Sequence, residues 1–108
     1  MIHATLPTGA ETLTISTVAG TPLAFIQTAA SAPDWKPRKG TNSFRIYVRS
    51  GSINCSGSFT PTTTTGQKVA SGNTIEYINV SLDAVQIIRD GGSDATIHIF
   101  PFQDNLKR

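Results

Sequence analysis

Short runs of β-branched and aromatic residues, each closed by glycine, proline, serine or threonine, occupy most of this 108-residue chain. Runs of this size suit β-strands, and the residues between them favour turns. The spacing predicts about seven or eight strands and no convincing amphipathic helix. An all-β, antiparallel β-sandwich is therefore expected. A jelly-roll-like arrangement is preferred to an immunoglobulin fold, because Trp35 and Cys55 do not make the Cys–Trp–Cys set of that fold.

Apolar residues alternate with polar ones along several of these runs. Strands are expected at residues 11–18, 23–28, 43–50, 52–59, 68–70 and 74–80. The first two should form a hairpin around the turn at residues 19–22. Residues 43–50 give the cleanest alternation, and residues 74–80 are expected to be a central strand because both faces carry apolar side chains.

The segment at residues 83–102, DAVQIIRDGGSDATIHIFPF, carries two apolar runs around a Gly-Gly turn. It predicts a β-hairpin that closes the fold. Asp90 and Asp94 flank the turn, and carboxylates so placed can offer oxygen ligands to calcium. An EF-hand loop needs more acidic positions, and Asp and Gly are common turn residues for conformational reasons alone. The aspartates are therefore interpreted as turn residues, and no metal site is expected.

The chain has the length of one domain, expected to span residues 1–108. Residues 1–11 are expected to form an irregular N-terminal arm, because Pro7 and Gly9 interrupt regular structure, and such arms can reach a neighbouring subunit.

The one cysteine, Cys55, has no partner for an internal disulfide and no nearby histidine, so it is interpreted as a buried structural thiol. Neither a signal peptide nor a membrane-spanning run of about 18 apolar residues is found, so no membrane association is expected.

Charge is scarce and unevenly placed. Only 15% of the residues are charged, while fifteen threonines and ten serines predict a hydroxyl-rich surface. Residues 35–75 carry six basic and no acidic residues, and the remainder carries three basic and seven acidic ones, for a net charge of +2. The six are Lys36, Arg38, Lys39, Arg45, Arg49 and Lys68. This asymmetry can steer association with an acidic partner or a second copy of the chain.

The inventory for catalysis is thin, and the protein is expected not to be an enzyme. His3 lies in the arm and His98 in a strand, pointing away from its apolar neighbours. No G-x-S-x-G turn, zinc-type Cys/His spacing, P-loop or dinucleotide fingerprint occurs, so no catalytic, cofactor-binding or metal-binding residue is assigned. A small hydrolase remains an alternative, because the two catalytic carboxylates of a glycosidase can lie far apart in the sequence and come together only in the folded protein.

Two binding alternatives rest on aromatic and basic side chains. Trp35 stands in the longest expected loop, residues 29–42, where it can stack on a base or sugar or fold back onto the end of the sandwich; the second is preferred. With Tyr47 and Tyr77 it makes a candidate sugar-stacking set, so a carbohydrate-binding module is the main alternative. Nucleic-acid binding through Lys36, Arg38, Lys39, Arg45 and Arg49 is less favoured, because the net charge is small.

The segment IEYINVSLDAVQIIRDGGSDATIHIF resembles small virion proteins of tailed bacteriophages, and the rest of the chain resembles them in its Thr/Ser-rich, weakly charged composition. The resemblance implies a β-sandwich protein of the capsid decoration (cement) type or of the tail or baseplate. It further implies a homo-oligomer, trimers being common, that binds capsid or tail proteins and catalyses nothing. Such a protein is made in the bacterial host cytoplasm and located in the virion.

Overall fold

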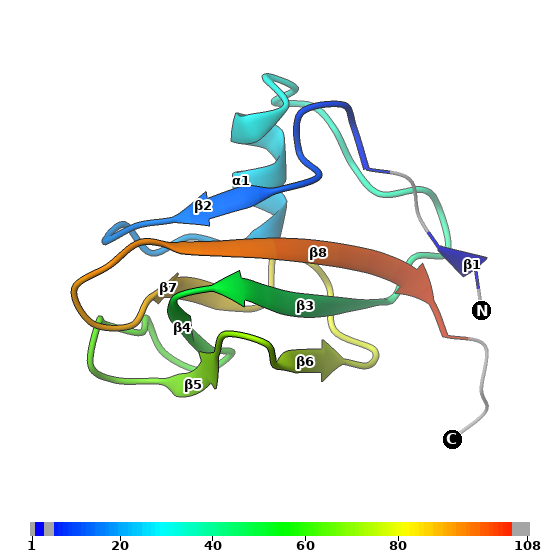
Figure 1. Ribbon diagram of the computed structural model, residues 1–108. Helices are drawn as coiled ribbons and strands as arrows, with labels where there is room; N and C mark the ends of the chain where they lie inside the picture. Colours follow the sequence, from blue (N-terminus) through cyan, green and yellow to red (C-terminus); the bar gives the residue numbers. More distant parts are fainter. Residues whose placement is uncertain (1, 4–5, 105–108) are drawn as a thin grey trace.

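The computed structural model describes residues 2–3 and 6–104, which form two antiparallel β-sheets and one short helix (Figure 1). The large sheet contains β1 (Ile2–His3), β2 (Leu13–Ile15), β3 (Ser43–Ser50), β6 (Thr74–Tyr77) and β8 (Ala95–Gln103). The small sheet contains β4 (Ser52–Ser56), β5 (Gln67–Ala70) and β7 (Gln86–Arg89). Helix α1 (Pro22–Ala29) lies between β2 and β3 in the chain. The predicted β-sandwich is confirmed.

The strand order shows how the chain passes between the two sheets. The large sheet runs β1-β8-β3-β6, with β2 also paired to β8, and the small sheet runs β5-β4-β7. The chain after β2 leaves β8 and continues along the free side of β7: Arg89 N donates to Ser16 O at 3.1 Å, and Gly20 and Ile87 exchange two backbone hydrogen bonds of 3.1 and 2.8 Å. Residues 16–20 thus run beside β7 at the edge of the small sheet, and this arrangement agrees with the jelly-roll-like sandwich expected from the sequence.

The hydrophobic core lies between the sheets. Phe44, Ile46 and Val48 of β3 point inward and are fully buried, as the alternation in residues 43–50 predicts. They meet inward side chains of the small sheet such as Ile53 and Ile87, which are also fully buried. Burial of each such side chain is worth about 1.5–3 kcal/mol, so this one core holds both sheets together.

The predicted first hairpin is wrong, because residues 22–29 form α1 and not a strand. Thr21 caps the helix: its Oγ1 accepts a hydrogen bond from Ala24 N at 3.2 Å. Pro22 occupies the first turn, where its missing N–H costs nothing, and Ile26 buries the helix against the core. A short amphipathic run after Thr-Pro is therefore helical although its residues also suit a strand.

The predicted closing hairpin is also wrong. β7 pairs with β4 in the small sheet, whereas β8 pairs with β3 in the large one, so the Gly-Gly turn carries the chain from one sheet to the other. Likewise β6 is an edge strand and not the central strand expected at residues 74–80. Among the described strands, only β4 and β5 are chain neighbours that pair with each other.

Where the structure describes it, the predicted N-terminal arm lies against its own chain. Ile2 and His3 pair with Gln103 and Phe102 of β8, and Ala10 is fully buried. Residues 1 and 4–5 of the arm lie outside the described part. The described chain has no helix with the length and apolar character that crossing a membrane requires.

Candidate functional site

The outer face of the large sheet carries a row of rings. On β3 and β8 every second side chain points away from the core, which places Tyr47, His98 and Phe100 on this face. The Tyr47 and His98 rings stack across the strand pair, with centroids 6.1 Å apart and planes 15° apart, and the His98 and Phe100 centroids are 6.3 Å apart. We call these three residues the aromatic strip. Phe100 is 43% exposed, which is high for a phenylalanine.

Neighbouring groups hold the strip in place. His98 Nδ1 lies 2.8 Å from the backbone oxygen of Glu11, which fixes the imidazole ring. Arg45 forms an ion pair with Glu76 at 2.6 Å, and its guanidinium lies 5.5 Å from the ring centre of the buried Phe102. The outer face of an antiparallel sheet is usually polar, so rigid exposed rings at this position are typical of an interaction surface.

The structure separates the three residues of the predicted sugar-stacking set. Trp35 is half-buried and packs against the core, which confirms the interpretation that it folds back. Tyr77 lies on the inner side of β6, where its ring stacks on Phe44 at 5.0 Å. Only Tyr47 belongs to the outer face. His98 and Phe100 were not predicted as its partners, although their alternation with Ile97 and Ile99 signals a shared outer face.

The cations proposed for nucleic-acid binding also fall into two groups. Lys36, Arg38 and Lys39 line a groove of about 360 Å³ beside the loop that precedes β3. Arg45 and Arg49 lie along β3, and Arg45 is engaged by Glu76. Two further pairs, Lys68–Asp90 at 3.3 Å and Arg89–Asp94 at 2.6 Å, also join basic to acidic residues. Part of the charge asymmetry seen in the sequence is therefore neutralised within the chain.

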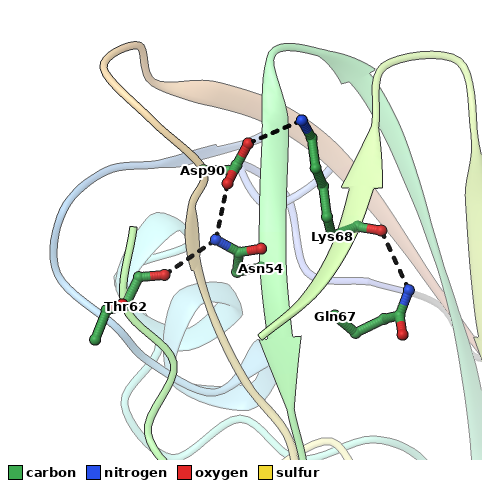
Figure 2. A network of polar contacts seen from close by, with 5 residues as sticks. All are labelled: Asn54, Thr62, Gln67, Lys68 and Asp90. Atoms are coloured by element: carbon green, nitrogen blue, oxygen red, sulfur yellow. Dashed lines mark hydrogen bonds and ion pairs between the residues drawn. The ribbon is translucent and has the colours of Figure 1, made fainter. Parts of the chain in front are cut away.

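The two aspartates of the Gly-Gly turn take structural roles. Asn54 donates a hydrogen bond of 3.0 Å to Asp90 Oδ1 and another of 3.0 Å to the backbone oxygen of Thr62 (Figure 2). Asp90 Oδ2 faces the Lys68 ammonium, and Asp94 faces Arg89. The carboxylates are thus directed at donors and cations. Within residues 2–3 and 6–104, no group of three or more His, Cys, Asp or Glu side chains is placed to hold a metal ion.

Cys55 is the buried structural thiol that the sequence predicts. It is 1% exposed, and burial raises its pKa from 9.0 to about 12, although a hydrogen bond with Tyr77 opposes the rise. Burial also raises the pKa of the Tyr77 hydroxyl. At neutral pH both groups are therefore protonated. They line a hollow of about 510 Å³ between β4 and β6, together with Phe59 and Ile75.

Comparison with known proteins finds no matching family model, no matching curated protein and no matching solved structure.

Proposed function

We propose that this protein is a non-enzymatic structural component of a bacteriophage virion, and that it stabilises a capsid or tail assembly through protein–protein contacts. The observation that carries the proposal is the aromatic strip on the outer sheet face, in which Phe100 is exposed and Tyr47 and His98 are half-buried. The jelly-roll-like sandwich adds support by analogy, because viral capsid domains are among the proteins that use such a fold. The sequence resemblance to small virion proteins points in the same direction.

The strip suits a protein partner. Aromatic and arginine side chains contribute most of the binding energy in many interfaces, because they bury large areas at a small cost in conformational entropy. Here the rings are already ordered by Glu11 and by strand pairing, so little further ordering is required on binding. The partner is a capsid or tail protein, or a second copy of this chain in a homo-oligomer such as a trimer, within a virion assembled in the bacterial cytoplasm.

Replacement of one exposed ring tests the proposal. Phe100→Ser should weaken self-association or binding to phage particles by about tenfold or more, with the fold retained. Val18→Ser is the matched control, because Val18 is also apolar and 70% exposed but lies away from the strip. Light scattering gives the oligomeric state and co-sedimentation measures binding to phage particles. A protein that is monomeric at every concentration and does not bind phage capsids or tails contradicts the proposal.

A carbohydrate-binding module is the second candidate. It is favoured by the nearly parallel Tyr47 and His98 rings, since a sugar ring stacks on a flat aromatic surface. Trp35 is packed against the core, so its fluorescence is a poor reporter of binding at the strip. Ring resonances of Tyr47 and His98, followed by NMR during titration with glycans, report directly. If they do not shift with any glycan of a broad panel, this candidate is excluded.

A further inference from the structure

We propose that the groove beside the loop at residues 36–41 is a separate binding site for an acidic peptide segment of a partner protein. Lys36, Arg38 and Lys39 form one wall of this groove, which has a volume of about 360 Å³. Leu23, which is half-buried, provides apolar surface in the lining, and the buried Leu82 lies behind it. Ser81 and Asp83 are the polar residues of the turn that completes it. The groove therefore combines a cationic wall with apolar contact area.

The three cations of the wall have no acidic partner among the described residues. The ion pairs of the described residues join Arg45 to Glu76, Lys68 to Asp90 and Arg89 to Asp94. No corresponding pair holds Lys36, Arg38 or Lys39, although the three lie within four consecutive positions. Like charges placed this close repel one another, so an anionic ligand is favoured there over water alone.

The backbone of the wall is anchored at both ends. Before the wall, Trp35 packs against the core and its backbone oxygen accepts a hydrogen bond of 2.8 Å from Gln27 Nε2. After it, Asn42 N donates to Phe102 O at 3.2 Å, and Gly40 has a φ of +95° and packs against the Gln103 side chain. A ligand therefore meets a backbone that is already ordered, which reduces the entropic cost of binding.

An acidic peptide fits this groove better than a nucleic acid. Glutamate or aspartate side chains would face the cations, and an apolar side chain would contact Leu23. Asp83, which accepts a hydrogen bond of 2.5 Å from Ser81, also lines the groove, where its carboxylate can accept a hydrogen bond from a peptide N–H, a donor that a sugar–phosphate backbone lacks. Within residues 6–104, the remaining cation without an ion pair is Arg49, which lies near the far end of β3, roughly 20 Å along the strand, so these residues form no continuous basic track.

Fluorescence anisotropy with a labelled, end-blocked peptide of glutamate and leucine tests the site. The triple variant Lys36→Gln, Arg38→Gln, Lys39→Gln should bind the peptide roughly tenfold more weakly than the unmodified protein. Asp83→Asn should bind it several-fold more tightly, because a like charge is removed from the groove. Arg49→Gln is the matched control, since it removes one unpaired cation outside the groove, and it should leave the affinity unchanged. Circular dichroism verifies that each variant is folded.

Three outcomes overturn the inference. They are the absence of peptide binding, an equal loss of affinity in Arg49→Gln, and tighter binding of a single-stranded oligothymidylate than of the peptide, which would assign the cations to nucleic acid. Phe100 lies outside the groove, so the Phe100→Ser variant should bind the peptide as tightly as the unmodified protein. Failure of this site is therefore distinguishable from failure of the aromatic strip.

Discussion

At the scale of single residues, the Asn54 side chain links two segments that lie far apart in the sequence. It is 2% exposed and joins β4 to the threonine-rich loop through Thr62 and to the Gly-Gly turn through Asp90 (Figure 2). Asn54→Ala should lower the free energy of unfolding by about 1–3 kcal/mol, because two partly buried hydrogen bonds are lost while their acceptors remain. Gln67→Ala is the control: Gln67 is exposed and makes only a hydrogen bond of 3.4 Å to the Lys68 backbone, so its loss should be nearly neutral. Urea denaturation of the three proteins compares them, and equal midpoints would refute the role of Asn54.

Cys55 makes stability depend on alkaline pH. Its pKa is raised from 9.0 to about 12 in the folded protein, so above pH 9.0 the unfolded chain loses the proton while the folded chain keeps it. The free energy of unfolding should therefore fall as the pH rises above 9.0 toward 12, and should be insensitive to this group at neutral pH. Cys55→Ala should show a smaller fall, with a remainder from Tyr77, whose pKa is also raised. Urea denaturation at neutral and alkaline pH measures the difference, and identical pH profiles would contradict it.

At this scale, the sequence predicts a residue's position only when the pattern that reveals it lies among its neighbours in the chain. The alternation at residues 43–50 correctly puts Phe44, Ile46 and Val48 on one face, which the structure buries, because strand alternation depends only on adjacent positions. Asn54 was missed, since its acceptor Asp90 lies 36 positions away and no local pattern announces the pair. The aromatic strip lies between these cases. Alternation placed His98 on an outer face, but its neighbour Tyr47 is known only once β3 and β8 are paired.

At the scale of elements, most strands were predictable, although residues 23–28 form a helix, and strand partnership was not predictable. The Ser50-Gly51 and Gly91-Gly92 turns have the chemistry of hairpin turns, yet both carry the chain from one sheet to the other. A turn residue reports local backbone conformation, and the same positive φ serves a hairpin or a crossover. Which strand pairs with which is decided by burial of the shared core, to which distant segments contribute. The hairpin predicted at residues 83–102 was wrong for this reason, whereas the one predicted at residues 11–28 was wrong because residues 22–29 form α1.

The crossover from β3 to β4 depends on Gly51 far more than the crossover from β7 to β8 depends on Gly92. Gly51 has a φ of +74°, and a Cβ on it would lie 2.9 Å from both Asp94 O and Ala95 Cα. Gly51→Ala should therefore cost about 2 kcal/mol or more, from left-handed strain and from displacement of the start of β8. Gly92 has open space around its Cα and no positive φ, so Gly92→Ala should change stability by about 0.5 kcal/mol at most. Thermal melts of both variants test this, and comparable losses would show that the close approach at Gly51 is relieved.

At the scale of the whole molecule, β8 joins the two ends of the chain. It pairs with β1 and β2 on one side and with β3 on the other, so the large sheet cannot form before the last strand is present. At the opposite side of the sandwich, β5 and β6 each form an open edge of their sheets (Figure 1). Non-local pairing of this kind is typical of domains that fold in milliseconds to seconds. One core, shared by both sheets, then makes unfolding cooperative.

Pairing of the ends also predicts that the chain tolerates circular permutation. Ile2 lies opposite Gln103 in the strand ladder, so a short glycine- and serine-rich linker can join the two ends. New ends placed between Gly91 and Gly92 open an exposed crossover where no other atom lies within 4 Å of either glycine's Cβ position. The permuted protein should fold with a single thermal transition and lose about 1–2 kcal/mol of stability. If the closing segment were instead the hairpin that its sequence suggests, this cut would separate two partner strands and destabilise the domain much further. Retention of the near-ultraviolet circular dichroism spectrum, with a midpoint close to that of the uncut protein, therefore distinguishes the crossover from the hairpin.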